Sequence, residues 1–478
     1  MSHRTASLLL RLLASLAAPL LLRLSVAAAE PTANTDWKAL DAEALRHFQA
    51  LLRVDSSGPP TWEKPAVDYL RTVLETEGIE TKTFFVDANR PNLVARIRGN
   101  GTKRPLLIMA HTDVVNVDPK KWQHLPFGAT LEDGYIYGRG TVDDKDNVTA
   151  GLMTMLLLKR TKVELDRDVI FLAEAGEEAQ VEFGIEFMTR EHFAEIDAEF
   201  CLAEGGGVTR SGGKPQYGSV QTTEKIPNRL RLVAHGNASH GSVPVRTNVI
   251  SHLARAIANL SDWQIPMRLN ETTRAFFERL AEISSAEDAA RYRAILAGDE
   301  NGSAQEYLAE HKPQYNSMLR TSVAPTVFNA GYRVNVIPSE AEATLDVRAL
   351  PDEDVPAFIE HLKKVVNDPA IEITKAPGHL RPGAPPSSIH AEPFEVIEAA
   401  IKRHYGVVTL PSMSTGATDM SFLRAKGIQC YGIGPMTDIE DLLKGFGAHS
   451  DQERILEEAL YKFVRFNWDV VLDLSAKK

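Results

Sequence analysis

The sequence predicts an α/β domain with a mostly parallel mixed sheet, into which a ferredoxin-like α+β domain is inserted. Apolar strand-like runs alternate with amphipathic helical segments in the first part of the chain. From about residue 224, the order becomes strand, helix, two strands, helix, strand. Because 478 residues are too many for one ordinary core, we expect residues 30–223 and 378–478 to form the first domain and residues 224–377 the second.

The first domain is expected to begin with two amphipathic helices, at residues 36–54 and 64–78, with Gly78 ending the second. Strand-like runs then follow at residues 79–86, 93–97 and 106–110, and a third helix is expected at about 146–160. The buried strands "DVIFLAEA" and "AEFCLAEG", with a helix between them, continue the alternation. This order is typical of parallel strands joined by helices.

The second domain is expected to be a small sheet with one face covered by helices. Its strands are "NRLRLVAHG", "TVFNAGYRVNVI", "EAEATLDVRAL" and "IEITK", and its helices are "RTNVISHLARAIANL" and "DVPAFIEHLKKVV". An additional, mostly helical segment at about 264–321 separates the first helix from the second strand. The Pro- and Gly-rich "APGHLRPGAPPSS" is interpreted as a linker back to the first domain.

The first 29 residues have the order of a secretory signal peptide. A basic start is followed by the apolar run 12–22 and by three alanines before Glu30. The alternative, a membrane anchor, needs about 20 apolar residues, and this run is too short. We therefore expect a periplasmic or secreted protein with no membrane association after the signal is removed.

Charge and cysteine content exclude several classes of protein. Removing Arg4, Arg11 and Arg23 with the signal changes the net charge from −11 to −14 (−11 − 3), and no basic run remains. Nucleic acid and anionic membranes are therefore poor candidates as partners. Cys201 and Cys430 lie in apolar segments, so buried thiols are the simplest interpretation, and whether they pair stays open.

A histidine and an aspartate end the apolar run 106–110, at His111 and Asp113. Side chains two residues apart on a strand point to the same face, so these two would lie side by side at the carboxyl end of the strand. Active sites of open α/β sheets lie at that end. His111 is either a structural histidine satisfied by Asp113 or a metal ligand whose second ring nitrogen Asp113 orients.

Further acids and a histidine occur at strand-to-helix junctions of the same domain: Asp143, Asp144, Glu177, Glu178, Glu204 and His449. Each alone has an ordinary explanation, such as helix capping, but all should meet at one edge of one sheet. Imidazole and carboxylate ligands without thiolate suit Zn, Co or Mn. Two histidines and three acids are enough for two metal ions, and a spare acid can take a proton from water.

The stretches "AHTDVV", "YIYGRGTVDDK", "GEE", "AEGG", "SHGSVP", "NVIP", "LDVR" and "GAHSDQE" resemble, in this order and spacing, the M20 family of co-catalytic zinc metallopeptidases. The family includes glutamate carboxypeptidase, aminoacylase and succinyl-diaminopimelate desuccinylase, and the likeness is greatest to the yeast carboxypeptidase S branch. The resemblance implies two Zn²⁺ per chain, for which Co²⁺ or Mn²⁺ can substitute. It assigns His111 and Glu204 to one ion and Glu178 and His449 to the other, with Asp143 bridging.

The resemblance also implies roles for residues beside the ligands. Asp113 would orient His111, and Glu177 would be the general base. Asp143 and Asp144 would be joined by a cis peptide bond. One position departs from the family pattern: Gly176 stands where an aspartate usually precedes the two glutamates, so no role is carried over to it.

In the second domain, the resemblance implies a homodimer that forms through this lid domain. His240 would reach the partner's site and stabilise the oxyanion. Arg348, Asn335 and the loop at Gly416 would surround the carboxylate or carbonyl side of the substrate. An arginine fork can hold a carboxylate with two hydrogen bonds.

The resulting hypothesis is a dinuclear zinc hydrolase that cleaves a small peptide or N-acyl amino acid next to its free carboxylate. Glu204, where aminopeptidase relatives tend to have Asp, favours carboxypeptidase-like chemistry. N-acyl-amino-acid hydrolysis (aminoacylase) or dipeptidase activity on the same site is the alternative. A non-catalytic peptide-binding protein is the hypothesis from a different class, and the complete ligand set argues against it. Side-chain specificity, the native metal and the effect of the helical segment on dimer formation stay open.

Overall fold

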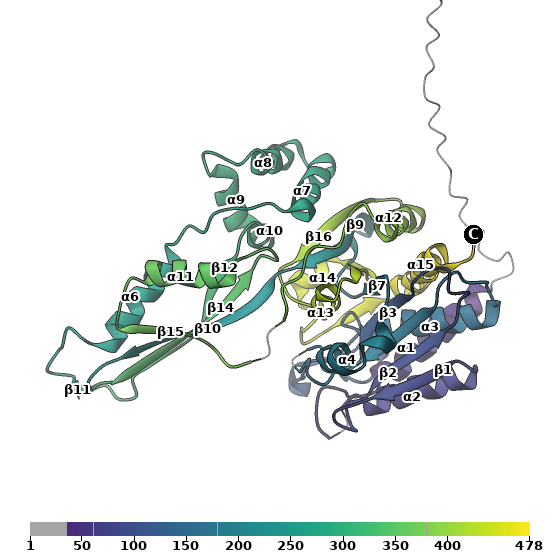
Figure 1. Ribbon diagram of the computed structural model, residues 1–478, viewed down its shortest axis with the longest axis horizontal. Helices are drawn as coiled ribbons and strands as arrows, with labels where there is room; N and C mark the ends of the chain where they lie inside the picture. The colour runs from purple at the N-terminus through teal and green to yellow at the C-terminus, as the bar shows by residue number, and fades with distance from the viewer. Residues whose placement is uncertain (1–35, 61, 179, 379–380) are drawn as a thin grey trace, which may run out of the picture.

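The computed structural model describes residues 36–478 apart from residues 61, 179 and 379–380. The predicted signal peptide, residues 1–29, lies outside the described residues, and its assignment stays a prediction. Among the described helices, none combines the length and apolar character needed to cross a lipid bilayer. The described chain forms two larger sheets with their helices, which lie end to end in Figure 1, and two small sheets.

The larger unit is a ten-stranded mixed sheet in the order β1-β2-β6-β3-β7-β17-β9-β8-β18, with β16 beside β9. Five of its nine pairings are parallel, which confirms the mixed α/β sheet. The strands are β1 (Glu80–Phe84), β2 (Asn92–Ile97), β3 (Leu106–His111), β6 (Val169–Glu174), β7 (Phe200–Ala203), β8 (Gly207–Ser211), β9 (Lys214–Glu224), β16 (Val408–Ser414), β17 (Gln429–Gly432) and β18 (Met436–Asp438).

Helices cover both faces of this sheet because its central strands are apolar on both faces. In β3, Leu106 and Ile108 contribute to one apolar core, whereas Leu107 and Met109 contribute to the other. The helices of this unit are α1 (Trp37–Leu52), α2 (Lys64–Thr76), α3 (Lys145–Thr161), α4 (Ile185–Glu191), α5 (Phe193–Ile196), α12 (Glu392–Tyr405), α13 (Met420–Ala425), α14 (Ile439–Lys444) and α15 (Glu457–Ser475). A fully buried centre of this kind holds β3 and its carboxyl end rigidly.

Cys201 and Cys430 lie opposite each other on the neighbouring parallel strands β7 and β17. Both side chains are fully buried and both are free thiols. Burial raises the pKa of Cys201 well above its usual value, so this thiol stays protonated and unreactive. The expectation of buried thiols is confirmed.

The smaller unit, the lid, is a four-stranded antiparallel sheet in the order β12-β14-β10-β15. Its elements follow the chain in the predicted ferredoxin-like order, with α6 and α11 packed into one core against the sheet. They are β10 (Ile226–His235), α6 (Val249–Ser261), β12 (Ser322–Ala330), β14 (Glu340–Ala349), α11 (Val355–Val366) and β15 (Ile371–Lys375). The chain passes from the large sheet into the lid at Lys225, between β9 and β10.

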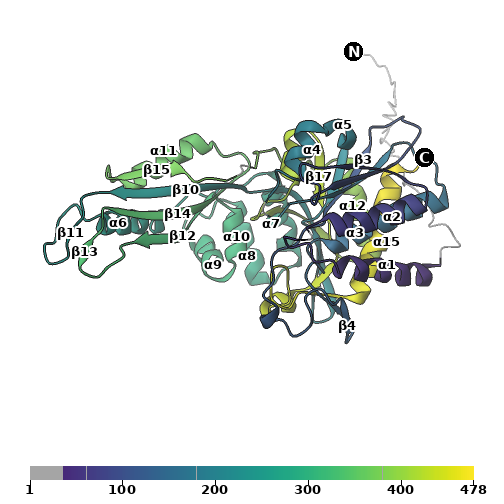
Figure 2. The same ribbon diagram turned by 90° about the horizontal axis from the view of Figure 1, so that it is seen from below.

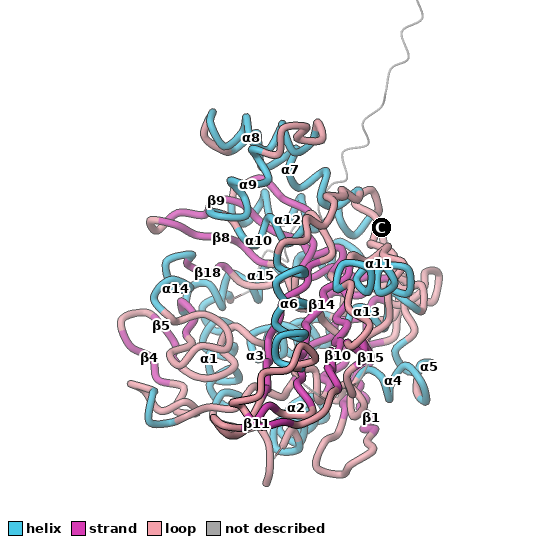
Figure 3. Tube along the Cα trace, turned by 90° about the vertical axis from the view of Figure 1, so that its left-hand side faces the viewer, coloured by secondary structure: helices cyan, strands magenta, loops and turns pink. Residues whose placement is uncertain are grey.

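The additional segment between α6 and β12 is helical, as predicted. It consists of α7 (Glu271–Ile283), α8 (Ala286–Leu296), α9 (Ser303–His311) and α10 (Pro313–Met318). Viewed from the lid end, α7, α8 and α9 lie apart from the lid helices α6 and α11 (Figure 3). These inserted helices share one apolar core with Leu350, at the end of β14, and with Leu410 and Met413 of β16. The insertion therefore packs against both the lid and the large sheet.

Two small sheets complete the fold. The antiparallel pair β11 (Ser239–His240) and β13 (Val336–Ile337) lies at the end of the lid that is farthest from the large sheet (Figures 1 and 2). Beside the large sheet, β4 (Thr130–Glu132), β5 (Tyr135–Tyr137) and β19 (Arg454–Leu456) pair in the order β19-β5-β4. A short 3₁₀ helix, Pro119–Lys121, precedes β4.

Candidate functional site

The candidate site lies where three parallel strands of the large sheet end. His111 is the last residue of β3 and pairs with Glu174, the last residue of β6. Glu177 and Glu178 follow β6 after a short turn, and Glu204 directly follows β7. Because β6, β3 and β7 are neighbours, their carboxyl ends share one edge of the sheet.

Asp143 lies between the two predicted histidine ligands and turns one carboxylate oxygen toward each. Its Oδ1 is 3.0 Å from His111 Nε2, and its Oδ2 is 3.0 Å from His449 Nε2. The two histidines come from opposite ends of the first domain's sequence, one from β3 and one from the loop before β19. The structure therefore brings them together around a single aspartate.

His111, Asp143 and His449 form a row, and a glutamate lies at each end of it. His111 Nε2 is 3.9 Å from Glu204 Oε2, and His449 Nε2 is 3.1 Å from both carboxylate oxygens of Glu178. All five predicted ligands thus belong to one continuous cluster. Two groups of residues within it have donor atoms close enough for a shared ion: His111, Asp143 and Glu178, and His111, Glu177 and Glu204.

Asp113 holds both the histidine ring and the glutamate turn. His111 Nδ1 lies 3.0 Å from the main-chain oxygen of Asp113 and 3.5 Å from its Oδ1. The Asp113 carboxylate also accepts hydrogen bonds from the main-chain N–H groups of Glu177, at 3.2 Å, and Glu178, at 3.1 Å. One buried carboxylate therefore fixes two strand ends relative to each other, which the sequence did not indicate.

The peptide bond between Asp143 and Asp144 is cis, as predicted from the resemblance. The Asp144 carboxylate accepts hydrogen bonds from the main-chain N–H of His111, at 3.1 Å, and from Asn147 Nδ2, at 2.6 Å. Asp144 thus points away from the row and ties the start of α3 to the end of β3.

Gly176 adopts a left-handed backbone conformation, with φ of 77°, just before the two glutamates. A Cβ atom at this position would lie 2.4 Å from the main-chain oxygen of Gln180. Side chains rarely adopt this conformation, and the contact leaves no room for one. The turn in this chain is therefore built around glycine, which accounts for the departure from the usual aspartate.

Burial and mutual repulsion perturb the titration of the cluster. Burial raises the pKa of Glu177 to about 8 and that of Asp144 to about 7. Hydrogen bonds to Asp143 and Glu178 raise the pKa of His449 to about 10. For Asp143, hydrogen bonds from His111 and His449 outweigh burial and hold its pKa well below the usual range. The cluster has more carboxylates than histidines, so it favours added positive charge such as divalent cations.

Arg381 is a residue of the site that no sequence motif indicated. Its Nη2 donates hydrogen bonds to Glu177 Oε1, at 2.8 Å, and to the main-chain oxygen of Glu177, at 3.0 Å, while Nη1 donates to Asp419 Oδ1 at 2.6 Å. It lies in the Pro- and Gly-rich segment that the sequence indicated only as a linker. No local pattern marks it, because its role depends on where the segment returns to the large sheet.

The predicted lid residues do not all reach this cluster within one chain. His240 and Asn335 are exposed and lie at β11 and next to β13, at the far end of the lid (Figure 1). Arg348 lies near the other end of β14, about eight residues or roughly 26 Å from Glu340 along the strand. The structure therefore separates Asn335 from Arg348 within one chain, although the family resemblance implied that both surround one end of the substrate.

Arg348 and Gly416 lie on the same side of the lid junction. Arg348 pairs with Pro227, two residues after Lys225, and the N–H of Lys225 donates to the Ser414 oxygen at 2.9 Å. Gly416 follows Ser414 by two residues and donates its N–H to Ser414 Oγ at 3.1 Å. The Arg348 guanidinium is already paired with Asp346, with Nε to Oδ1 at 2.9 Å.

Arg381→Gln is expected to destabilise the metal-free protein by an amount that grows with pH. As pH rises through about 6 and 8, Asp419 and Glu177 lose their protons. In the unaltered protein, Arg381 stabilises both carboxylates, whereas in the variant they have no cationic partner there. Urea unfolding should show a loss of about 3 to 5 kcal/mol at pH 8.5 and a smaller loss at pH 5. Arg160→Gln, which removes a surface pair with Glu43, is the control without such growth. An equal loss at both pH values would contradict the prediction.

Comparison with known proteins identifies relatives along most of the chain. The model of peptidase family M20/M25/M40 matches residues 107–472. The chain is 31% identical over 329 residues to probable carboxypeptidase S-like 2 of Dictyostelium discoideum. These residues cover 66% of this chain and 62% of the relative, so the match spans under two thirds of the relative's length. The chain is 27% identical over 380 residues to the human N-fatty-acyl-amino acid synthase/hydrolase PM20D1, covering 77% of this chain and 74% of the relative.

Solved structures share the fold. The M20 family metallo-carboxypeptidase Sso-CP2 from Sulfolobus solfataricus superposes with a TM-score of 0.68 at 22% identity, covering 90% of this chain and 98% of that one. The YXEP protein of Bacillus subtilis, described as a dinuclear metal binding peptidase from the M20 family, gives 0.58 at 17% identity, covering 92% and 99%. Together with the family match over residues 107–472, these findings show that the chain belongs to peptidase family M20/M25/M40.

Proposed function

We propose that the chain is a dinuclear zinc hydrolase that cleaves a peptide or N-acyl amide bond next to a free C-terminal carboxylate. The observation that carries this proposal is Asp143, which presents one carboxylate oxygen to each of two histidines. The relatives support it, since they include a metallo-carboxypeptidase and an N-fatty-acyl-amino acid synthase/hydrolase. N-acyl-amino-acid or dipeptide hydrolysis at the same site is the alternative use of this chemistry.

The residues of the row fit two divalent ions. Imidazole nitrogens and carboxylate oxygens suit Zn²⁺, and Co²⁺ or Mn²⁺ as substitutes. His111 and Glu204 would hold one ion, Glu178 and His449 the other, and Asp143 both. Asp113 would fix the ring of His111 through the contact at Nδ1, a support that metal-ligating histidines commonly have.

Glu177 is the proposed general base. Bound divalent ions lower the pKa of water and polarise a carbonyl group. Glu177 is held by Arg381 rather than by either histidine, so its carboxylate can accept the water's proton and return it to the leaving amine. In the metal-free protein, burial raises the pKa of Glu177 to about 8, and Arg381 keeps this pKa from rising further.

Substitutions of the two neighbouring glutamates, Glu177 and Glu178, should have different effects on metal binding. We expect two ions per chain in the unaltered protein and in Glu177→Gln, and fewer in Glu178→Gln, because of these two glutamates it is Glu178 that contacts His449. Turnover of Glu177→Gln should fall roughly 100- to 10,000-fold, as expected for loss of a general base. Elemental analysis after dialysis measures the ions. If Glu177→Gln loses an ion instead, the group His111, Glu177 and Glu204 is the metal site and the two roles are exchanged.

We propose that Arg348, with the loop at Gly416, recognises the substrate's free carboxylate. Arg348 is half-buried at the junction of lid and large sheet, and its pairing with Asp346 holds the guanidinium in one orientation. Gly416 lies on the adjoining loop, whose last residue, Asp419, pairs with Arg381. Because Arg381 also contacts Glu177, this loop adjoins the proposed general base, which supports the proposal.

N-acyl amino acids or dipeptides should be cleaved at least tenfold faster than their C-terminal amides. An amide would lose the charge-assisted hydrogen bonds that a carboxylate accepts from the guanidinium, at a cost of about 1 to 3 kcal/mol. Arg348→Ala should abolish the preference, as measured by kcat/KM on matched acid and amide substrates. Arg231→Ala, on the same sheet but paired with Glu342 at the surface, should preserve it. Equal rates on acid and amide by the unaltered enzyme would reject the carboxypeptidase-like function.

We further propose that the lid forms a homodimer in which His240 and Asn335 serve the partner's site. Neither residue lies near the metal row of its own chain, and both are exposed at the far end of the lid. β12 is an edge strand of the lid sheet, with exposed apolar Val327 and Phe328. An exposed apolar edge of this kind favours pairing with a second copy.

Mixing His240→Ala chains with Glu177→Gln chains should restore activity that neither variant has alone. In a hybrid dimer, one site would combine an intact Glu177 with an intact His240 of the other chain. Loss of an oxyanion donor typically lowers turnover about 100- to 1,000-fold, so recovery is measurable. Subunit exchange is verified by mass spectrometry of tagged chains. Exchange without recovery would show that His240 does not act across the dimer.

A further inference from the structure

Glu178 and His449, the two residues proposed to hold the same metal ion, come from loops rather than from strand ends. The N–H of Gln180 donates to the oxygen of Gly176 at 2.8 Å and closes the turn that carries Glu178. His449 lies in the loop between α14 and β19 and has a left-handed backbone conformation, with φ of 60°. A residue other than glycine keeps such a conformation only where surrounding contacts hold it. The positions of both ligands therefore depend on what their loops pack against.

Arg90, two residues before β2, contacts the turn that carries the two glutamates. Its side chain is buried, and its Nη1 donates to Gln180 Oε1. A Cβ atom at Gly176 would lie 3.2 Å from Arg90 Nη2, so the guanidinium lies directly against the main chain of this glycine. The position that departs from the family pattern is thus packed against an arginine.

Three side chains hold the Arg90 guanidinium in one orientation. Glu63, which is fully buried, accepts hydrogen bonds from Nε at 3.1 Å and from Nη2 at 2.5 Å. The ring centroids of Trp62 and Phe183 lie 4.3 and 4.5 Å from the guanidinium carbon. A planar guanidinium can pair with a carboxylate and stack on aromatic rings at the same time, which a lysine ammonium cannot do.

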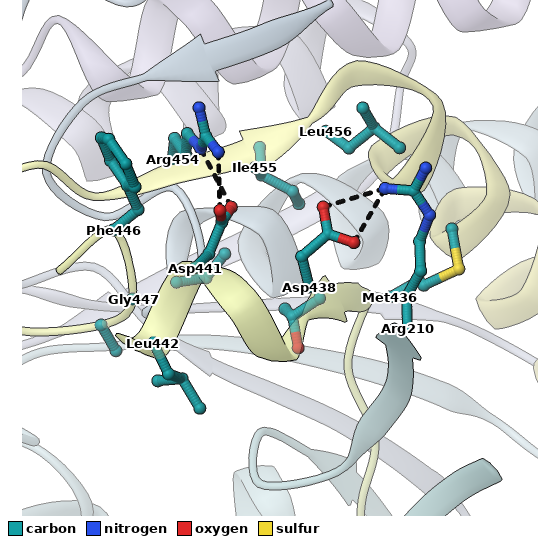
Figure 4. Close-up of a pocket in the computed structure, with 13 residues that line it drawn as sticks. Arg210, Met436, Asp438, Asp441, Leu442, Phe446, Gly447, Arg454, Ile455 and Leu456 are labelled. Carbon is teal, nitrogen blue, oxygen red and sulfur yellow. Dashed lines mark hydrogen bonds and ion pairs between the residues drawn. The ribbon is translucent and has the colours of Figure 1, made fainter. Parts of the chain in front are cut away.

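Arg454 holds the loop of His449 with the same kinds of contact. Asp441 of α14 accepts hydrogen bonds from its Nε at 2.9 Å and from its Nη2 at 2.6 Å (Figure 4). The ring centroids of Tyr135 and Phe446 lie 3.8 and 4.1 Å from the guanidinium carbon. The main-chain N–H of Arg454 donates to the oxygen of Phe446 at 3.1 Å, which closes the loop around His449.

We propose that Arg90 and Arg454 position the two loops so that Glu178 and His449 meet at one metal ion. The inference rests on the proposed function, because the assignment of these two ligands to one ion comes from there. Each arginine is paired with a carboxylate and packed on two rings, so it acts on a ligand through the loop and is a positioning residue. His111 ends β3 and Glu204 directly follows β7, so the strands of the buried sheet position the ligands of the other ion.

Arg90→Lys and Arg454→Lys should each weaken the binding of one metal ion and leave the other unchanged. Lysine keeps the positive charge but loses the two parallel hydrogen bonds and the stacking. Calorimetric titration of the metal-free protein with Zn²⁺ should show one of two sites weakened roughly 10- to 100-fold, as is typical when contacts that orient metal ligands are lost. The combined variant should still retain one ion, because both arginines serve the same one.

Two arginine–carboxylate pairs outside these loops provide matched controls. Arg167 is 1% exposed, pairs with Glu199 at 3.1 Å and precedes β6, at the end of that strand opposite the glutamates. Arg210 pairs with Asp438 at 2.8 Å and lies near Arg454 in Figure 4. Arg167→Lys and Arg210→Lys should bind both ions as the unaltered protein does. Loss of an ion in the controls as well, or loss of both ions in the combined variant, overturns the inference.

Hydrogen exchange of the metal-free protein gives a readout that needs neither metal nor substrate. Arg90→Lys should speed exchange in the peptide that carries Glu177 and Glu178 roughly tenfold or more, and Arg454→Lys should do so in the peptide that carries His449. Faster exchange confined to the matching loop supports the inference even if the unaltered protein binds one ion or cleaves no amide, so that the proposed function fails. Unchanged exchange in both loops overturns the inference.

Gln180→Ala keeps the test decisive if Arg90→Lys does not fold. This substitution removes the side-chain acceptor on the glutamate turn and leaves the buried pair of Arg90 with Glu63 intact. It should speed exchange in the same peptide and weaken the same ion. Exchange and metal binding equal to those of the unaltered protein would show that Arg90 does not position the turn.

Discussion

The gathering of carboxylates at one buried sheet edge is the constraint on which the rest of the structure depends. Asp113, Asp143, Glu177, Glu178 and Glu204 lie close together with only two histidines among them. Carboxylates removed from water repel one another and are stable only when paired. Three sets of contacts stabilise these carboxylates. Histidines lie on either side of Asp143, main-chain N–H groups donate to Asp113, and Arg381 donates to Glu177. The remaining excess of negative charge is what gives the edge its affinity for cations.

The sheet supplies the rigidity that such a cluster needs. His111 and Glu174 are paired last residues of two strands that are buried on both faces, so a shift of either would disturb both apolar cores. His449 is different, because its loop lies outside the strands and its side chain is half exposed. The row is thus built from a fixed half on β3 and a looser half on the loop beside α14.

The sequence was informative where chemistry followed a regular element. His111, Glu177, Glu178 and Glu204 could be predicted to meet because parallel strands end at one edge. Arg381 could not, because a Pro- and Gly-rich segment has no periodicity that fixes its path. Motif order likewise placed Arg348 and Asn335 together, whereas the length of β14 separates them within one chain. Sequence motifs predicted which residues have functional side chains. The path of the folded chain determines which of these side chains lie close together.

The inserted helices α7–α10 have a consequence for motion. They share a core with Leu410 and Met413 of the large sheet and with Leu350 of the lid. Inside the junction, Lys225 Nζ donates to the Ser317 oxygen and to Ser322 Oγ, which join the insertion and the lid. Two connecting segments alone would form a flexible hinge, but here any rotation of the lid must also slide packed helices across β16. The insertion therefore restricts the angle between the two units, which depends on side-chain packing and not only on backbone torsion angles.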